Sequence, residues 1–532
     1  MGPAHNVGSA APRPGSACVP RVRCRSGRSP SMIDRIKQWV VVMFENRSFD
    51  NLLGHLPHID AEDGIRGRDI ELPYPKGIVR VHPATNFTDP IPDPGEEYVD
   101  VNVQLFGAYR PESNKHRAAY TVFPDFMVDP FNAPQPGQRP SMDGFALNYY
   151  YTALWQLERE LSDAEMQGIG AVFTPETAPV INTLAEQYAV FTHWHCDVPS
   201  CTFPNRTFYH AGTSAGRVQN NITYDYAWDN DLPNLFDLMS EHGTTWKCYY
   251  DASQVVPLSA INLAGAKHVD LWRDHSAHMP EFYSDCANGM LPQYSWVEPR
   301  MMFGELDDYH PPTDVRAAEQ FLARVYNAVR TSPQWDSTAL VIMFDEHGGC
   351  YDHVPPPASV PPDGHPGEQG FGFDRLGVRV PTIVVSPFTK RGTVIRDLHT
   401  NTSMTHTLQQ VLGLGDPLTA RVAAARTIDA AFNRSEPRRD MHQLDPLPYT
   451  AGQPNPHAQQ PGPADLPSSA LWKQKAHEEA SQFVSHLGEV TLQNASTFLH
   501  RDLTGLPRNA ADAREWLRRN FALDGKFALR QL

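Results

Sequence analysis

The sequence predicts an α/β fold with a doubly wound sheet and helices on both of its faces. Residues 39–44, 339–344 and 380–385 form continuous apolar runs of strand length rather than alternating ones. Such runs are typical of parallel strands that are covered on both sides. Helical periodicity lies between or after them, at residues 177–187, 314–331 and 403–414. Strands that alternate with helices in this way indicate a doubly wound sheet.

Polar residues follow each of the three predicted strands. Glu45 and Asn46 come after the first strand, Asp345 and Glu346 after the second, and Ser386 after the third. Ligands of open α/β sheets bind outside the carboxyl ends of the strands. We therefore expect the functional site along the carboxyl edge of the sheet.

Composition divides the rest of the chain into segments. Residues 1–31 contain no acidic residue and are rich in Pro, Gly, Ser and Arg, which predicts a disordered tail, or a true start at Met32. The α/β domain is expected over 32–432, with a cap-like insertion rich in Pro, Tyr and Asp at 60–170. The predicted C-terminal parts are a Pro-rich linker over 433–470 and a small helical region over 471–532.

The chain is acidic, which limits its partners. Its 532 residues include 45 Lys and Arg against 61 Asp and Glu, a formal net charge of −16. This balance argues against nucleic acid and against electrostatic docking on anionic membranes. No run approaches the roughly 18–20 apolar residues of a membrane-spanning helix, so we expect no integral membrane association. No export signal is recognisable in residues 1–31, so we expect a cytoplasmic protein. The oligomeric state is not predicted.

The cysteines give little guidance. The chain has 7 of them and no CxxC pair, which favours free, mostly buried thiols over a zinc or redox site. A link between Cys196 and Cys201 stays open.

The two strand ends offer oxygen ligands. Glu45 and Asn46 supply a carboxylate and an amide oxygen, which suit hard or borderline divalent cations. Alternatively, residues 46–50 only cap the next helix. Asp345 and Glu346 are adjacent carboxylates, and a cation between them would relieve their repulsion. The alternative for Asp345 and Glu346 is a polar turn whose carboxylates are solvated.

Two other segments carry reactive side chains. Residues 198–214 contain the hydroxyls of Ser200 and Thr202 and a candidate phosphate clamp, Arg206, unless this is an ordinary turn before a helix. His310 precedes a Pro-Pro pair, which fixes its backbone. A histidine is a suitable acid for a leaving group near neutral pH, although a lone histidine is often structural.

Five strings together resemble a known family. They are Glu45-Asn-Arg-Ser-Phe-Asp50, Thr202-Phe-Pro-Asn-Arg206, His310-Pro-Pro, Asp345-Glu-His-Gly-Gly349 with Asp352-His-Val354, and Val378-Arg-Val-Pro381 leading to Ser386-Pro387. In this order, over roughly residues 34–415, they are similar to bacterial phosphoesterases, which include non-haemolytic phospholipases C and acid phosphatases, and to plant non-specific phospholipases C.

The resemblance implies an alkaline-phosphatase-like fold and a metal-dependent phosphoric ester hydrolase. It implies a divalent metal, of unknown identity, held by Glu45, Asn46, Asp345 and Glu346 with a hydroxyl nucleophile as a further ligand. Thr202 occupies the nucleophile position, with Ser200 and Cys201 as weaker alternatives. His310 matches an active-site histidine, and His353 matches a histidine whose role is uncertain.

Two departures from the family pattern concern the residues that face the substrate. A histidine expected shortly before Met142-Asp-Gly-Phe145 is missing from residues 123–129. The family string Asp-His-Thr-Ser is replaced by Thr400-Asn-Thr-Ser403, and His399 is the candidate substitute. The choice between a phospholipid and a small phosphate ester as substrate therefore stays open.

The predicted mechanism is attack by Thr202 on phosphorus, with a phosphothreonine intermediate. Asn46 and Arg206 are expected to stabilise the transition state, and His310 is expected to protonate the leaving oxygen. Two alternatives stay open: a catalytically weakened binding protein of the same fold, and a sulfatase- or phosphonate-type hydrolase. The second is weak because Cys201 lies three residues before Pro204 rather than the two that the sulfatase string requires.

Overall fold

The computed structural model describes most of the chain between residues 31 and 450. The described residues are 31–121, 125–220, 226–227, 229–254, 256–265, 267–302, 305–440 and 442–450. They belong to the unit that begins at Met32, apart from Ser31. The predicted N-terminal tail and C-terminal helical region lie outside the described residues, as does most of the predicted linker.

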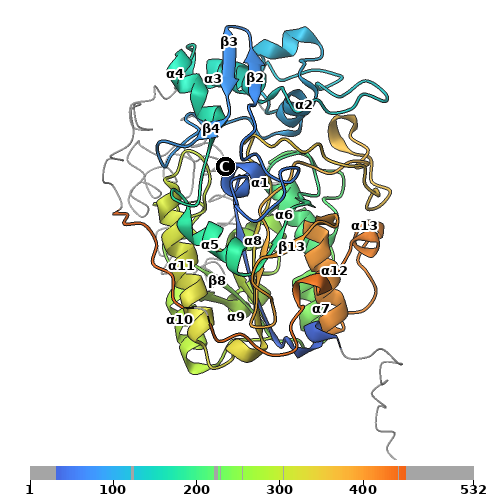
Figure 1. Cartoon of the computed structure of the whole chain (residues 1–532). Helices are drawn as coiled ribbons and strands as arrows, with labels where there is room; N and C mark the ends of the chain where they lie inside the picture. The colour runs from blue at the N-terminus through green and yellow to red at the C-terminus, as the bar shows by residue number, and fades with distance from the viewer. Residues whose placement is uncertain are drawn as a thin grey trace, which may run out of the picture. The chain divides into compact units, whose positions relative to one another are not determined.

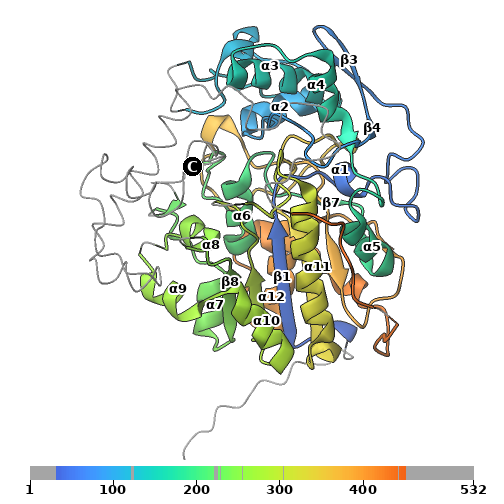
Figure 2. The ribbon, with the colours of Figure 1, turned by 90° about the vertical axis from the view of Figure 1, so that its left-hand side faces the viewer.

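A mixed sheet of eight strands forms the centre of the fold (Figures 1 and 2). Its order is β13 (Thr393–Ile395), β6 (Ala189–Phe191), β12 (Ile383–Val385), β11 (Thr338–Phe344), β1 (Gln38–Phe44), β10 (Tyr294–Val297), β8 (Trp246–Tyr250) and β9 (Ser276–His278). The run from β11 to β9 is parallel throughout. This confirms the predicted α/β class.

The two central strands end at the same level. β1 and β11 pair in parallel over their whole length, with Val41 opposite Val341 and Phe44 opposite Phe344. Every residue of β11 is buried, as is every residue of β1 after Gln38, which accounts for their unbroken apolar sequences. The residues that follow Phe44 and Phe344 therefore leave the sheet side by side.

The third predicted strand is antiparallel to its neighbours in the sheet, which corrects the expectation of a parallel strand there. β12 is antiparallel to both β11 and β6, and Val385 pairs with Leu340 near the start of β11. Ser386 therefore lies at the edge opposite Asp345. The reason is the connection: between β11 and β12 the only helical turn is η6 (Glu368–Gly370). A parallel strand needs a long crossover, usually a helix, to return the chain to the starting edge.

Helices cover both faces of the sheet, as predicted (Figure 1). One layer contains α1 (Phe49–Leu53), α5 (Pro179–Gln187), α10 (Met279–Asn288) and α11 (Val315–Thr331). The other contains α6 (Thr202–Ala211), α7 (Leu235–Glu241), α8 (Leu258–Asn262), α12 (Asn401–Leu412) and α13 (Ala420–Ala424). Helix α9 (Val269–His275) packs beside β8. The helices predicted from periodicity correspond to α5, α11 and α12.

Residues 60–170 contain more regular structure than their sequence indicates. Their elements are β2 (Glu71–Tyr74), β3 (Gly77–Arg80), β4 (His82–Pro83), α2 (Tyr98–Phe106), η2 (Glu112–His116), α3 (Phe145–Leu157), α4 (Asp163–Met166) and η3 (Gln167–Gly170). Helix α3 packs on both α2 and β2, and the three elements share a second apolar cluster that includes Leu72, Leu105 and Tyr149. The role of this segment as a cap stays a prediction.

The remaining short elements join these layers. They are η1 (Met32–Arg35), β5 (Ala171–Val172), β7 (Trp194–His195), η5 (Trp335–Ser337), β14 (His399–Thr400) and η7 (Asp429–Ala431). The described part of the predicted linker runs beside α11, where Asn327 donates to the carbonyl oxygen of Leu444 at 2.9 Å.

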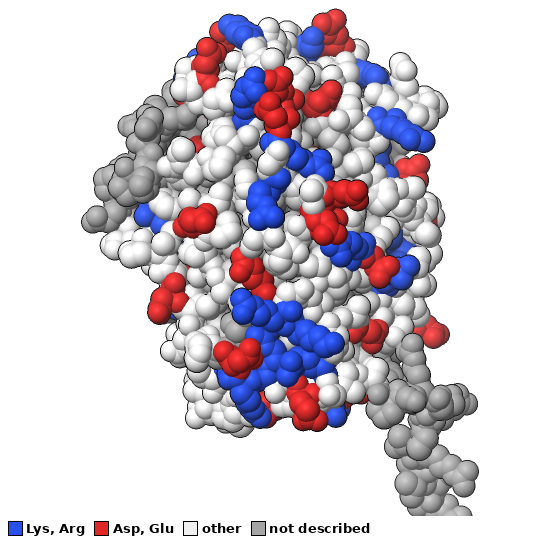
Figure 3. All heavy atoms as spheres, in the orientation of Figure 1, with Lys and Arg blue, Asp and Glu red and all other residues white. Residues whose placement is uncertain are grey.

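The described residues contain no helix with both the length and the apolarity that a membrane crossing requires. Charge is unevenly spread over the surface. In Figure 3, Lys and Arg gather in a patch in the lower half of the face shown, whereas Asp and Glu are scattered over the whole of that face.

Candidate active site

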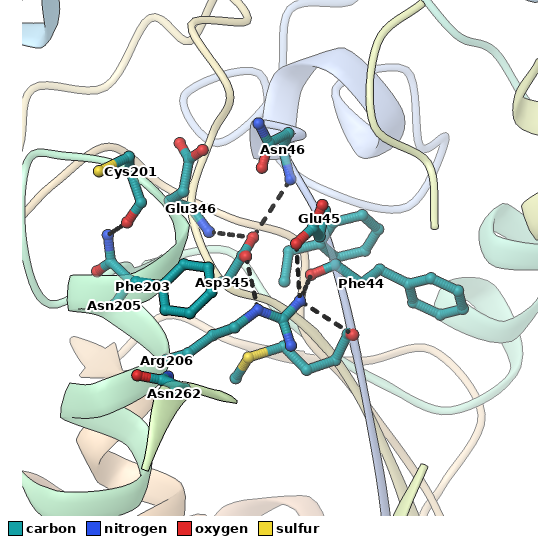
Figure 4. Close-up of polar contacts among 12 residues, drawn as sticks. Phe44, Glu45, Asn46, Cys201, Phe203, Asn205, Arg206, Asn262, Asp345 and Glu346 are labelled. Carbon is teal, nitrogen blue, oxygen red and sulfur yellow. Dashed lines mark hydrogen bonds and ion pairs between the residues drawn. The ribbon is translucent and has the colours of Figure 1, made fainter. Parts of the chain in front are cut away.

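The ends of β1 and β11 bring four of the predicted site residues together (Figure 4). The Asn46 amide N–H donates to Asp345 Oδ1 at 3.3 Å, and the Glu346 N–H donates to the same oxygen at 2.7 Å. All four residues, including Glu45, are buried. The Glu45 N–H is held by the carbonyl oxygen of Asp308 at 2.9 Å. Residues about three hundred positions apart therefore form one acidic cluster.

The local backbone explains this convergence. Asn46 has a φ of 56°, a left-handed conformation that turns the chain sharply at the end of β1. Gly348, with a φ of 59°, packs directly against it: a Cβ on Gly348 would lie 2.5 Å from the carbonyl oxygen of Asn46. Only glycine allows this close approach with a positive φ.

Arg206 is the one cation that directly contacts Glu45 or Asp345 among the ion pairs of the described residues. Its Nε donates to Asp345 Oδ2 at 3.0 Å, and its Nη2 lies 3.5 Å from Glu45 Oε1. Nη2 also faces the carbonyl oxygen of Phe44 at 3.4 Å. The guanidinium thus offsets part of the negative charge of the acidic cluster, and only its buried Nη1 has no hydrogen-bond partner among the described residues. The predicted phosphate-clamp role of Arg206 stays a prediction that depends on Nη1.

Thr202 is the first residue of α6 and is buried. It lies one helical turn before Arg206, and residues four apart share a helix face with their side chains tilted towards the N-terminus. Thr202 is therefore on the face of α6 that meets Asp345 and Glu45. In Figure 4, Cys201 and Phe203, which flank Thr202, lie beside Glu346 and Arg206.

The two alternative nucleophiles are engaged elsewhere. The Ser200 hydroxyl donates to the carbonyl oxygen of Val218 at 2.5 Å. The Cys201 thiol donates to Glu97 Oε2 at 3.3 Å, and burial raises the pKa of Cys201 well above its ordinary value. A thiol that keeps its proton is a poor nucleophile.

His310 also reaches the cluster. The carbonyl oxygen of Pro311 lies 2.6 Å from His310 Nδ1, which holds a proton on that nitrogen. Nε2 then accepts from Asn46 Nδ2 at 2.9 Å. The backbone N–H of His310 donates to Asp308 Oδ1 at 2.9 Å. The predicted histidine and the predicted metal ligands therefore meet at Asn46.

Glu96 is a residue of this site that the sequence analysis missed. Asn46 Nδ2 donates to its Oε2, and that oxygen lies 3.8 Å from His310 Nε2. Nearby, Asp93 Oδ1 lies 3.7 Å from His310 Nδ1. The signal was present in the sequence, because residues 89–97 place four carboxylates among prolines, an unusual acidic density inside the segment interpreted as a cap.

The charges of the cluster are not balanced by protein groups alone. Burial, followed by the charge of Asp345, raises the pKa of Glu45 and of Glu346 well above the ordinary value. Burial also raises the pKa of Asp345, although Arg206 partly offsets it. The buried site atoms without a hydrogen-bond partner among the described residues include Asn46 Oδ1, Glu346 Oε1, Glu96 Oε1 and Arg206 Nη1.

This donor set fits the metal that the sequence resemblance implies. Buried polar atoms almost always have partners, so unpartnered Asn46 Oδ1 and Glu346 Oε1 indicate a missing ligand. Oxygen atoms from carboxylates, an amide and a hydroxyl suit a hard or borderline divalent cation.

His353 belongs to a different cluster. Its Nδ1 lies 2.6 Å from Asp50 Oδ2, and its backbone N–H donates to the same oxygen at 2.8 Å. Ligand atoms of Asp50, Asp352 and His353 lie within 4.8 Å of one another, a group that could hold a metal ion. Arg379 already pairs with both carboxylates, at 2.9 Å from Asp50 and 3.0 Å from Asp352. This positive charge makes a cation there redundant.

The replaced family string contributes a residue to the site after all. Asn401 donates through Nδ2 to the backbone oxygen of Asp345 at 3.0 Å, and its Oδ1 accepts from Trp194 Nε1 at 2.8 Å. It therefore fixes the end of β11. His399, the candidate substitute, instead stacks on Trp194 with ring centroids 5.6 Å apart and binds the backbone oxygen of Asp397.

Comparison with known proteins identifies the family. The model of the phosphoesterase family matches residues 36–415. The chain belongs to the phosphoesterase family. Non-specific phospholipase C3 of Arabidopsis thaliana is 33% identical over 426 residues, which cover 76% of this chain and 75% of that protein. Non-specific phospholipase C1 of the same plant is 35% identical over 430 residues, covering 76% and 72%.

A bacterial relative extends the similarity. Phospholipase C B of Mycobacterium tuberculosis is 27% identical over 476 residues, which cover 80% of this chain and 84% of that protein. This phosphoesterase is thus a phospholipase C-like phosphoric ester hydrolase. Among solved structures, a protein in the alkaline phosphatase superfamily from Vibrio parahaemolyticus matches with a TM-score of 0.29 at 12% identity, over 50% of this chain and 64% of that one.

Proposed function

We propose that this phosphoesterase hydrolyses phospholipids or smaller phosphate esters through a Thr202 nucleophile and one divalent cation held by Glu45, Asn46, Asp345 and Glu346. The observation that carries the proposal is the convergence of these oxygen donors, two of them without hydrogen-bond partners, beside the first turn of α6. When bound there, a divalent cation would polarise the phosphoryl oxygen and lower the pKa of a hydroxyl against it.

The residues of the chain then have separate tasks. Thr202 Oγ, having released its proton to water, forms a bond to phosphorus as the bond from phosphorus to the leaving alcohol breaks. His310, having taken a proton from water on Nε2, gives that proton to the leaving oxygen and keeps the one on Nδ1. Asn46 Nδ2 is an N–H donor at this place and stabilises charge on the phosphoryl oxygens once substrate replaces its present contacts. Water then cleaves the phosphothreonine and restores Thr202.

Arg206 supports this chemistry through its positive charge. Its ion pair with Asp345 leaves one positive charge permanently next to the carboxylates, so a divalent cation does not have to compensate all of them. Asn401 and Gly348 fix the two backbone turns that present the donors. Asn401 and Gly348 are not expected to touch substrate, and Arg206 would contact it only through Nη1.

The substrate class is proposed from the relatives. The similar plant and mycobacterial proteins are named phospholipases C, so we propose a phospholipid whose bond between glycerol and phosphate is broken. The acidic composition gives no support to a nucleic acid substrate. A cytoplasmic location also remains a proposal.

The test compares Thr202→Ala, Thr202→Ser and Ser200→Ala in the full chain. Turnover of phosphatidylcholine in mixed micelles, of bis-p-nitrophenyl phosphate and of p-nitrophenyl sulfate would be measured with and without prior chelation. We expect Thr202→Ala to lose at least about 10³-fold in kcat, in line with removal of a catalytic nucleophile. Thr202→Ser and Ser200→Ala should keep activity within about tenfold.

Other results would redirect the assignment. Full activity of Thr202→Ala with loss in Ser200→Ala would move the nucleophile. Turnover of the sulfate but of neither phosphate would support the sulfatase alternative. Metal binding without turnover of any substrate would support the binding-protein alternative.

A further inference from the structure

Glu96 reaches the acidic cluster from outside the sheet. It precedes α2, within the 60–170 segment, whereas the other carboxylates follow strands β1 and β11. It is only 4% exposed. Its Oε2 accepts a hydrogen bond from Asn46 Nδ2, so it contacts a proposed metal ligand directly.

The second oxygen of this carboxylate is unused. Glu96 Oε1 is buried and has no hydrogen-bond partner among the described residues. The charged groups that most affect Glu96 are Glu346, Asp93, Glu97 and Glu45, which are all acidic. Among the described residues, Arg206 forms its ion pairs with Glu45 and Asp345, not with Glu96. A buried carboxylate oxygen among other carboxylates requires a cation or a proton.

We infer that Glu96 is a further ligand of the proposed divalent cation, supplied by the 60–170 segment. The inference rests on the proposed function, because it assigns a residue to that same metal centre. Three facts support it: the contact with Asn46, the unpartnered Oε1, and the proximity of Glu346, whose Oε1 is also unpartnered. The cation then joins the end of the sheet to the start of α2.

This arrangement has a structural consequence. Without a cation, Glu96 and the carboxylates at the strand ends repel each other, which weakens the contact between α2 and the loop after β11, where Gln104 Oε1 lies 2.8 Å from His347 Nε2. When the cation is bound, Glu96 and the carboxylates at the strand ends all attract it. This shared attraction holds α2 in place. Metal binding therefore orders the segment that lies beside His310.

The test measures Mn²⁺ affinity in the full chain after chelation and dialysis. Glu96→Gln keeps an acceptor for Asn46 Nδ2 but removes the charge, and Glu112→Gln is the control, since Glu112 is an exposed carboxylate of the same segment. We expect the Mn²⁺ Kd of Glu96→Gln to rise at least about tenfold, as for loss of a group that supports a metal site. Glu112→Gln should stay within about twofold of the wild type.

Amide hydrogen exchange provides a second readout that does not depend on turnover. Saturating Mn²⁺ should slow exchange over residues 97–106 in the wild type and in Glu112→Gln, and less so in Glu96→Gln. If Glu96→Gln does not fold, Glu96→Asp replaces it; this shorter carboxylate should also weaken Mn²⁺ binding.

The possible failures are distinct. Wild-type binding with an unchanged Kd in both Glu96 variants would overturn the role of Glu96 and leave the proposed function standing. Absence of Mn²⁺, Mg²⁺, Ca²⁺ and Zn²⁺ binding by the wild type would overturn the proposed function and the inference together.

Discussion

Arg206 on α6 donates from Nε to Asp345 Oδ2 at 3.0 Å, and this bond joins the helix that starts with Thr202 to the end of the central strand β11. Because Thr202 and Arg206 share a helix face, the bond also fixes the position of Thr202 relative to the carboxylates. Burial lowers the pKa of Arg206, but Asp345 and Glu45 outweigh it and the net shift is upward. One ion pair thus places the proposed nucleophile and offsets the charge of two proposed metal ligands.

Removal of this guanidinium should destabilise the protein most when metal is absent. Arg206→Met leaves buried Asp345 and Glu45 without their cation, and breaking a buried pair typically costs about 3–5 kcal/mol. We expect the free energy of unfolding in chelator to fall by about that amount, and a saturating divalent cation to restore part of it. Urea unfolding with and without metal measures both.

An exposed arginine provides the comparison. Arg66→Met removes a charge from the surface, where Arg66 donates to the backbone oxygen of Pro57, and should change stability by less than about 0.5 kcal/mol. Equal losses for Arg206→Met and Arg66→Met would mean that the buried ion pair is not significant for the fold.

The role of His310 can be tested through the leaving group. A general acid matters most when the leaving oxygen is basic, so His310→Ala should lose about 10²–10⁴-fold in kcat on a phosphate ester of an alkyl alcohol. On a p-nitrophenyl ester, whose leaving group needs no proton, the loss should be less than about tenfold. His242→Ala, at an exposed position after α7, is the control. Equal losses on both esters would assign His310 to positioning of Asn46 rather than to proton transfer.

Gly348 gives a test of the backbone turn under Asn46. Gly348→Ala combines an unfavourable positive φ with a Cβ that would lie 2.5 Å from the Asn46 carbonyl oxygen. Strain and overpacking together should cost about 2–5 kcal/mol of unfolding free energy and displace Asn46. Gly67→Ala has the same kind of φ but open space around the added methyl group, so it should cost only about 1–2 kcal/mol. Similar stability and full activity of both variants would show that the contact between Gly348 and Asn46 is needed neither for the fold nor for activity.

Much of the central fold and site could be predicted because buried parallel strands have a distinctive sequence. Continuous apolar runs located β1 and β11, and the polar residues after them located Glu45 and Asp345. The direction of β12 was not predictable from its composition, since an apolar run carries no sign of orientation. That direction followed from the missing crossover helix between residues 345 and 382.

Side chains that enter the site from loops were harder to find. Glu96 follows no buried strand, and its distance in sequence from Asn46 gives no hint of contact. Asn401 was recognised only as a substitution, although it braces Asp345. His353 illustrates the reverse case, because its motif lies next to Asp345 in sequence but its side chain pairs with Asp50.

His353 should contribute to stability in a pH-dependent way. Burial lowers its pKa, but the hydrogen bond and charge of Asp50 outweigh this and the net shift is upward from the ordinary value near 6.5. A histidine whose pKa is raised in the folded state stabilises fully below pH 6.5, and this stabilisation is lost as the pH rises through the folded-state pKa. His353→Gln should therefore cost about 1 kcal/mol at pH 5.5, since the pair is only partly shielded from water, and less at pH 9.

Urea unfolding at both pH values distinguishes this structural contribution from a chemical one. If His353 acts only through Asp50, His353→Gln should keep kcat within about tenfold of the wild type at pH 7, while its stability deficit shrinks from pH 5.5 to pH 9. A deficit that is constant with pH would contradict the pairing of a protonated His353 with Asp50. A loss of kcat above about 10²-fold, with stability unchanged, would instead place His353 among the reacting groups.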